Sequence, residues 1–154
     1  KILIGGGGPR VLRLAGRHAD IVGINPRLEA GKVTQHTAAD LAPERLDEKV
    51  RHVREGAERA GRSFDEIELN SLTFIVAITD DPKGVRAGLA ANTGMSVEQV
   101  ADCPIFLTGP PAEIRDRLEK RRKRFGISYI VIHGADQAIV EKFAEQIVAP
   151  LSGK

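Results

Sequence analysis

The amino-acid sequence predicts an α/β protein in which a parallel sheet of about four strands is covered by helices. Apolar, β-branched runs alternate along the chain with longer segments whose apolar residues recur at helical spacing. Glycine, proline and aspartate residues mark the turns between these segments. Strands that alternate with helices pair in parallel, because each crossover helix returns the chain to the same end of the sheet. The pattern allows both a doubly wound open sheet and a barrel.

The chain opens with a strand, a glycine-rich turn and a helix. An apolar run at 1–4 is followed by four glycines, and Pro9 suits the first position of a helix over 9–18. Glycines let backbone amides approach a ligand closely, and a helix N-terminus carries partial positive charge. Phosphate is the ligand that such a turn is best suited to bind; the alternative is a turn in which glycine only saves space. The buried face of this helix is expected to contain Leu12, Ala15 and Ala19, with Val11 and Leu14 beside them.

The remaining elements follow in regular order. The polar segment 27–42 has no clear periodicity and is interpreted as a functional or mobile loop. The apolar run 74–78 is expected to be covered on both faces, as in a buried parallel strand. Ser96 and Gln99 match a capping box. The predicted elements are a strand over 20–24, helices over 43–60, from Pro82 to about Gly94 and from Ser96, a strand over 67–79, a short extended piece from Ile105, a helix over 111–125, a strand over 127–132 and a helix over 137–148.

Charged side chains are expected on the solvent faces of the helices. Glu48 and Lys49, like Glu44 and Arg45, are assigned to the wet face of the helix over 43–60. The basic run 120–124 lies at a predicted helix C-terminus, where cations complement the helix dipole. It lacks interleaved aromatic residues, and the net charge is only +2. Nucleic acid and membrane surfaces are therefore not expected partners.

Two segments carry a family resemblance. Ile2-Leu3-Ile4-Gly5-Gly6-Gly7-Gly8-Pro9 and the helix end Leu14-Ala15-Gly16-Arg17-His18-Ala19-Asp20 resemble the luciferase-like family of flavin- and deazaflavin-dependent oxidoreductases. They are most similar to the branch that uses the 8-hydroxy-5-deazaflavin coenzyme F-420, although Ile21 stands where that branch usually has glycine. The segment from Phe106 to Leu118 resembles the family's late Gly-Thr-Pro-Glu-Glu segment, with Pro110 in place of threonine.

This resemblance covers nearly the whole chain and implies a TIM-type (β/α)8 barrel, of which these units form the C-terminal half. A complete barrel takes about 250 residues, so a chain of 154 residues supplies part of one. In the family, the Gly-Gly-Pro turn receives the cofactor's phosphate. Functional groups in such barrels lie at the C-terminal ends of strands. The expected cofactor-binding residues are Gly5, Gly6, Gly7, Gly8, Pro9, Gly23 and Asn25.

Other candidate residues could have a functional or a purely structural role. Asn25 could donate to the phosphate or to the cofactor edge, or only begin the loop with Pro26. His133, at a strand exit, could be a proton donor, a substrate contact or a hydrogen-bonded structural residue. Cys103 is expected to be a small buried residue, and no spacing predicts a metal site. Catalytic residues are not predicted, since the resemblance places the groups nearest the reactive ring in the first half of the barrel.

The resemblance implies hydride transfer between the deazaflavin C5 and an organic small-molecule substrate, with this chain supplying the cofactor-binding half. An FMN-dependent monooxygenase is the alternative, because the turn would bind a phosphate in either case. A non-catalytic half-barrel that binds a phosphate-bearing ligand is the rival from another class. A Rossmann-type dinucleotide domain fits poorly, because the final glycine of G-x-G-x-x-G is missing and no acidic residue ends the second strand.

The compartment and the partners follow from simpler features. With one cysteine there is no internal disulfide, and no signal peptide or membrane-spanning run is visible, so the cytoplasm is expected. The chain begins at Lys1 in mid-strand without methionine, which favours an incomplete N-terminus. Half a barrel leaves strand edges and an apolar inner face uncovered. It is therefore expected to form a homodimer or to pair with an N-terminal half-barrel, and to be inactive alone.

Overall fold

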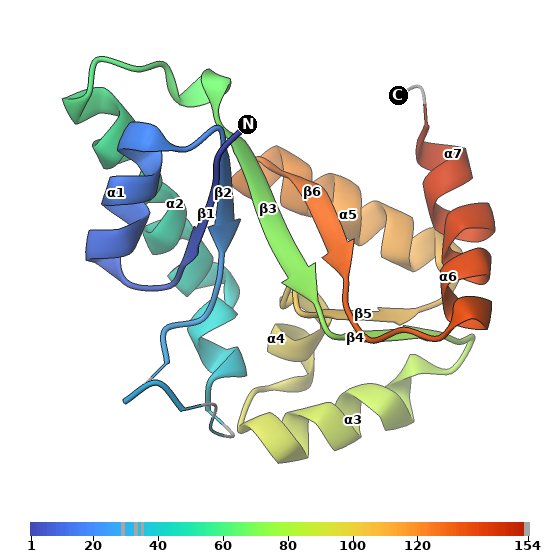
Figure 1. Ribbon diagram of the computed structural model, residues 1–154. Helices are drawn as coiled ribbons and strands as arrows, with labels where there is room; N and C mark the ends of the chain where they lie inside the picture. Colours follow the sequence, from blue (N-terminus) through green and yellow to red (C-terminus); the bar gives the residue numbers. More distant parts are fainter. Residues whose placement is uncertain (29, 33, 35, 153–154) are drawn as a thin grey trace.

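The computed structural model describes residues 1–28, 30–32, 34 and 36–152, and it confirms the α/β fold. The strand pairs within these residues are all parallel. They form a four-stranded sheet in the order β1-β2-β3-β6 and a two-stranded sheet, β4-β5 (Figure 1). The strands are β1 (Leu3–Gly6), β2 (Ile21–Ile24), β3 (Glu68–Thr73), β4 (Ile75–Ile78), β5 (Phe106–Gly109) and β6 (Ile127–Ile132).

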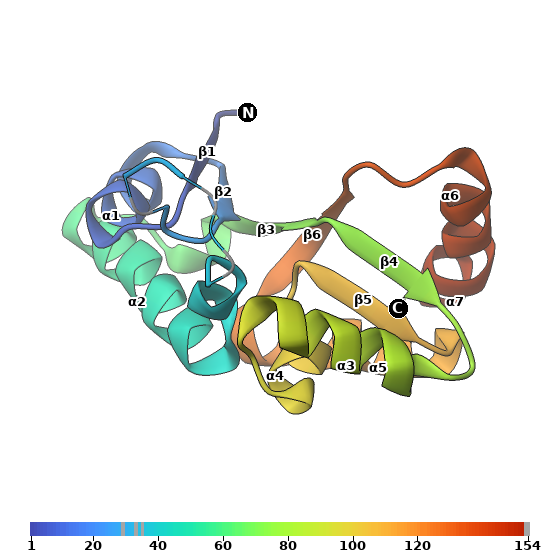
Figure 2. The ribbon, with the colours of Figure 1, turned by 90° about the horizontal axis from the view of Figure 1, so that it is seen from below.

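The helices lie close to their predicted positions. Figure 2 shows α1 and α2 at one end of the molecule and α6 and α7 at the other. The helix predicted over 137–148 is a short α-helix followed by a π-helical turn at Ala144–Val148. Short 3-10 turns lie at Ala38–Leu41 and Phe64–Glu66. The α-helices are α1 (Pro9–His18), α2 (Pro43–Arg59), α3 (Pro82–Thr93), α4 (Val97–Asp102), α5 (Pro111–Phe125), α6 (Gln137–Phe143) and α7 (Ala149–Leu151).

Helices α1 and α2 pack with their backbones in close contact. A Cβ atom on Gly16 would lie 2.1 Å from the carbonyl oxygen of Val53, and one on Gly56 would lie 2.2 Å from that of Arg13. The core beside this contact includes Leu12, Ala15, Ala19, Leu46 and Val53, all fully buried. Val11 and Leu14 were expected beside this stripe, but they are 40% and 47% exposed. The prediction was wrong for these two because α2 covers a narrower face of α1 than the apolar pattern indicates.

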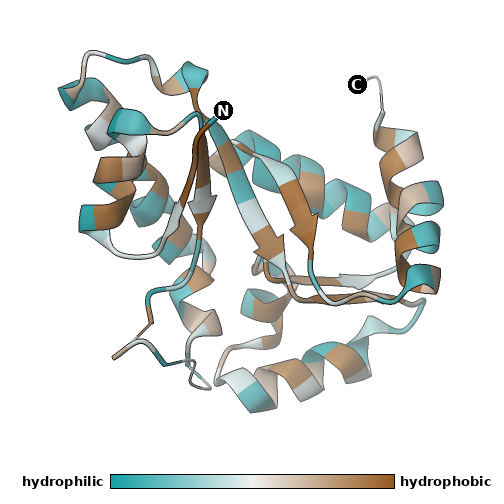
Figure 3. Ribbon diagram, viewed as in Figure 1, coloured by the Kyte–Doolittle hydropathy of each residue, from teal (hydrophilic) through white to brown (hydrophobic). Residues whose placement is uncertain are grey.

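The main sheet has one face covered by helices and one open face. Val22 and Leu69 pair across β2 and β3 and are buried. On the opposite face lie Leu3 and Tyr129, which are 52% and 39% exposed. Figure 3 shows apolar stretches along these strands. An apolar sheet face that lies open in this chain is the feature expected of the inner wall of a partial barrel.

The strand predicted over 67–79 is divided at Phe74. Before it, β3 pairs with β6; after it, β4 pairs with β5, and the Phe74 amide donates to the carbonyl of Ile105. Phe74 and Ile75 are 49% and 36% exposed. The expectation that 74–78 is covered on both faces is therefore wrong. Some apolar residues of this run lie on the open side of the sheet, and the others face the helix-covered core.

Two basic residues assigned to solvent are buried. Lys49 of α2 is 5% exposed, and Arg121 of α5 is 4% exposed. Arg121 Nη2 donates to the carbonyl oxygens of Ala101, Cys103 and Phe106, at 2.9 to 3.2 Å. It thereby joins the end of α4 to β5. The prediction of a solvated basic run holds for the other four residues of 120–124, which are all exposed.

The predicted capping box of α4 is present: Ser96 Oγ accepts from the Gln99 amide, and Gln99 Oε1 accepts from the Ser96 amide. Because Ser96 is exposed, Ser96→Ala removes the cap without opening a cavity. We expect it to lower the free energy of unfolding by about 1 kcal/mol. Urea denaturation tests this, with Ser96→Asp as the matched variant that keeps the cap. Equal losses in both variants would contradict the capping account.

Candidate functional site

The glycine turn leads from β1 into α1. Gly8 is the N-cap residue in an extended conformation, with φ of −92° and ψ of 152°, and Pro9 stands at the first helical turn. Within the described part of the chain, the amides of Arg10 and Val11 have no hydrogen-bond acceptor. The first turn of α1 contains no acidic side chain. The positive end of this helix is thus available to an anion.

The glycines of the turn have different neighbours. A Cβ on Gly7 would lie 2.4 Å from the backbone carbonyl of Pro26, so glycine is required there by the protein itself. A Cβ on Gly6 would lie 2.4 Å from a methyl group of Val11. A Cβ on Gly8 would have no protein atom within 4 Å. The space beside Gly8 therefore adjoins the unpaired amides of α1 and is not used for packing.

Gly23 and Asn25 lie beside this turn, as predicted. Gly5 and Gly23 are opposite each other on β1 and β2, and a Cβ on Gly5 would lie 2.9 Å from Asn25 Nδ2. The Asn25 amide donates to the carbonyl of Gly6 at 3.0 Å. Its side chain has no hydrogen-bond partner among the described residues, so its NH2 group can donate to a ligand.

Asn70 is a neighbour that the sequence analysis missed. It lies opposite Gly23 in the register of β2 and β3, and it is 7% exposed. Its Nδ2 donates to the carbonyl of Tyr129 at 3.1 Å, and a Cβ on Gly23 would lie 3.4 Å from its Oδ1. An asparagine inside a strand predicted to be apolar was the available signal. Two asparagine side chains thus lie over the glycine pair.

A largely buried ion pair, Lys49–Asp40, contacts the glycine turn. Lys49 Nζ donates to the carbonyl of Gly7 at 2.7 Å and to Asp40 Oδ2 at 2.6 Å. Asp40 Oδ2 also accepts from the Arg27 amide at 2.6 Å. Lys49 therefore joins α2, the glycine turn and the loop after β2. The signal in the sequence was its spacing, three residues after Leu46 and four before Val53, which places it on the buried stripe of α2.

Burial and pairing oppose each other at this pair. Burial alone would raise the pKa of Asp40, but hydrogen bonds from Lys49 and from the Arg27 amide outweigh it and hold that pKa below its ordinary value. Burial lowers the pKa of Lys49, and Asp40 opposes that change. Lys49 and Asp40 form an ion pair 2.6 Å long, in which the two charges offset each other. Its effect on the turn is therefore mainly to fix the position of the Gly7 carbonyl.

An apolar cavity of about 530 Å³ lies at the ends of β2 and β3. Asn25 and Pro26 line it, but the glycines of the turn do not. Its wall bears no charged side chain within the described residues. Asn25 therefore connects the turn to an apolar space. The other lining residues are Leu28, Thr34, Thr37, Ala38, Leu72, Phe74, Asn92, Thr93, Ile105 and Phe106.

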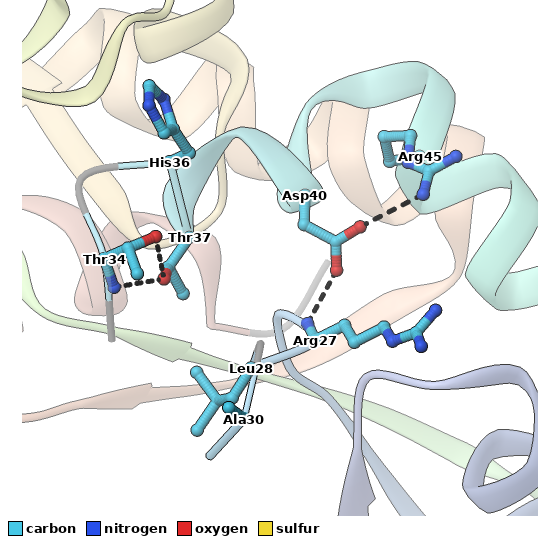
Figure 4. A pocket seen from close by; sticks show the side chains of 8 residues that line it. All are labelled: Arg27, Leu28, Ala30, Thr34, His36, Thr37, Asp40 and Arg45. Carbon is cyan, nitrogen blue, oxygen red and sulfur yellow. Dashed lines mark hydrogen bonds and ion pairs between the residues drawn. The ribbon is translucent and has the colours of Figure 1, made fainter. Parts of the chain in front are cut away.

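A second cavity, of about 480 Å³, adjoins the loop after β2; it shares Leu28, Thr34 and Thr37 with the apolar cavity but has charged side chains in its wall. Figure 4 shows Asp40 between Arg27 and Arg45 in its wall. Asp40 Oδ1 lies 3.4 Å from Arg45 Nη2, and this ion pair is half-exposed. Asp40 thus lines this cavity and also contacts the buried Lys49.

His133 and Cys103, the other candidate residues, are not part of a catalytic or metal-binding cluster among the described residues. His133 is exposed, and its ring lies edge-on to Phe74 with centroids 5.4 Å apart. Cys103 is buried, as predicted, and burial raises the pKa of its thiol to about 12. Across the described ranges, no three His, Cys, Asp or Glu side chains are grouped to hold a metal ion. In the same part of the chain, no helix has the length and apolar character needed to cross a bilayer.

The comparisons with known proteins concern the fold. No protein-family model and no curated protein sequence matches the chain. The coenzyme F-420-dependent tetrahydromethanopterin reductase from Methanopyrus kandleri matches with a TM-score of 0.64 and 21% identity, over 96% of this chain and 50% of that one. An F-420-dependent secondary alcohol dehydrogenase matches with a TM-score of 0.63 and 15% identity, over 96% and 48%. A long-chain alkane monooxygenase matches with a TM-score of 0.62 and 18% identity, over 97% and 40%.

The chain therefore has the fold of F-420-dependent reductases and flavin monooxygenases of the luciferase-like family. The predicted fold resemblance is confirmed, and the barrel reading is favoured over the doubly wound sheet. The chain spans about half of the length of these structures or less. The neighbours include both F-420-dependent enzymes and a monooxygenase, so they do not separate the two cofactor classes.

Proposed function

We propose that this chain is the cofactor-binding, C-terminal half of a luciferase-like oxidoreductase, and that its glycine turn binds the phosphate of coenzyme F-420. The observation that carries the proposal is the open space beside Gly8, next to the unpaired amides of Arg10 and Val11. A phosphate fits there because these donors and the helix N-terminus favour negative charge. Nothing in the packing of the described residues requires glycine at this position.

Each neighbouring residue has a definite part in this proposal. Lys49 and Asp40 hold the Gly7 carbonyl and so fix the direction of the turn. Gly5 and Gly23 have no side chains that would fill the space beside Asn25, and Asn25 can donate to the cofactor there. The bound deazaflavin would supply hydride transfer at its C5, while the protein binds and orients it. The open sheet face would be covered by the rest of a barrel, from the same polypeptide or from a partner.

Titration with F-420 and with FMN, followed by absorbance or fluorescence, tests the proposal. We expect the full-length protein to bind F-420 more tightly than FMN. The 154-residue chain alone should bind either cofactor weakly or not at all, because it holds one side of the site. Tighter binding of FMN would favour the monooxygenase alternative. Tight, stoichiometric binding by the isolated chain would contradict the division of the site between two half-barrels.

A further inference from the structure

We propose that the apolar cavity at the ends of β2 and β3 binds the organic substrate, and that this substrate is an uncharged, mainly apolar molecule with one hydrogen-bonding oxygen. The identity of the ligand as the substrate rests on the proposed function, whereas its binding to the cavity does not. The cavity has a volume of about 530 Å³, within the range of roughly 300–1,000 Å³ that is typical of small-molecule sites.

The cavity is enclosed by separate segments of this chain and is not only a part of the open sheet face. Its lining residues come from the loop after β2, the end of β3, the end of α3 and the stretch that leads into β5. Two large apolar side chains in this wall, Leu28 and Phe74, are 42% and 49% exposed. An apolar ligand would remove their surfaces from water, which favours its binding.

The composition of the wall disfavours charged ligands. None of the described residues that line the cavity is charged. The charged side chains of the neighbouring cavity, Arg27, Asp40 and Arg45, do not line this one. A carboxylate, phosphate or ammonium group in this space would lose hydration without gaining a counter-charge, and that loss is costly.

One polar side chain of the wall is free to bind a ligand. Asn92 and Thr93, at the end of α3, donate to backbone carbonyls of that helix at 2.9 and 2.7 Å. Thr37 Oγ1 accepts from the Thr34 amide at 2.8 Å. The Asn25 side chain has no hydrogen-bond partner within the described residues. Because its NH2 group has two hydrogens, it can donate both to the cofactor and to a carbonyl or hydroxyl oxygen of the substrate.

Three ligands that share a naphthalene body test this class of substrate: 2-acetylnaphthalene, naphthalene and 2-naphthoate. Each is titrated into the 154-residue chain without cofactor, and 1H–15N spectra give the affinity and locate the ligand. We expect saturable binding of 2-acetylnaphthalene at the cavity. Naphthalene, which lacks the oxygen, should bind about fivefold more weakly. The anion 2-naphthoate should bind at least about tenfold more weakly than the ketone.

Variants of the wall separate the cavity from the rest of the open face. Leu72→Asn should weaken the binding of 2-acetylnaphthalene about tenfold, because it removes apolar surface from the wall. Leu3→Asn is the matched control: Leu3 is also exposed on the open face but lies outside the cavity, so the affinity should not change. Asn25→Leu should give the ketone and naphthalene the same affinity. The same spectra show whether each variant remains folded.

The proposal is overturned if 2-acetylnaphthalene does not bind saturably, if 2-naphthoate binds as tightly as the ketone, or if Leu72→Asn and Leu3→Asn lose equal affinity. Displacement of 2-acetylnaphthalene by F-420 in the full-length protein would assign the cavity to the cofactor and would also overturn it. Because the ligand titrations contain no cofactor, their outcome is independent of the F-420 titration that tests the proposed function.

Discussion

Gly16→Ala is expected to destabilise the fold by about 3 kcal/mol or more. The added methyl group would meet the carbonyl oxygen of Val53 at 2.1 Å. That oxygen belongs to the backbone of α2, so the clash is relieved only by moving the two helices apart. Gly56→Ala should have a similar effect through the carbonyl of Arg13. The midpoint and slope of urea denaturation measure both changes.

Gly88→Ala is the matched control for this prediction. Gly88 lies within α3, and a Cβ there would have no atom within 4 Å. Alanine should therefore raise stability by up to about 1 kcal/mol through its higher helix propensity. If Gly16→Ala were as stable as the parent chain, the close packing of α1 on α2 would not describe the protein in solution.

Lys49→Met and Asp40→Asn are each expected to lower the free energy of unfolding by about 2 kcal/mol, because each removes a charged hydrogen-bond partner from a buried or partly buried group. Lys49→Met also frees the Gly7 carbonyl. The double variant should cost less than the sum of the two, and a double-mutant cycle measures that coupling. Arg45→Gln is the control, since its pair with Asp40 is long and half-exposed. Additive losses in the cycle would show that the two side chains do not interact.

Acid should remove the contribution of Asp40. Its pKa is lower in the folded chain than in the unfolded one, so its stabilisation is complete above the unfolded value of about 3.9 and is lost as the pH falls through the folded value. The stability difference between the parent chain and Asp40→Asn should therefore shrink below about pH 4. Urea midpoints at neutral and acid pH test this. A difference that stays constant with pH would contradict the ionised pair.

The sequence was most informative where local chemistry sets the structure. The strand, turn and helix around Pro9, and the cap at Ser96, depend on backbone preferences within a few residues. These features were predicted at nearly the observed positions. Gly23 and Asn25 could be placed near the turn because parallel strands end at the same edge of a sheet.

It was least informative where burial depends on what packs from elsewhere. Lys49 and Arg121 lie at positions whose helical spacing places them on the buried faces of α2 and α5. Because lysine and arginine are seldom buried, both were assigned to the solvent face despite that spacing. Phe74 reads as part of a buried strand, yet its inner side lies open in this chain. In each case, the neighbour that decides the burial is distant in the sequence or lies on another element.

The most direct test of the proposed site is the affinity of the full-length protein for F-420 before and after Gly8→Ala. The φ of Gly8 is accessible to alanine and no protein atom lies in its way, so the fold should lose at most about 1 kcal/mol, from the weaker N-cap. A phosphate held against the turn would meet the new methyl group, and the Kd should rise about tenfold or more. An unchanged Kd in a variant that remains folded would show that the glycine turn is not where the cofactor's phosphate binds.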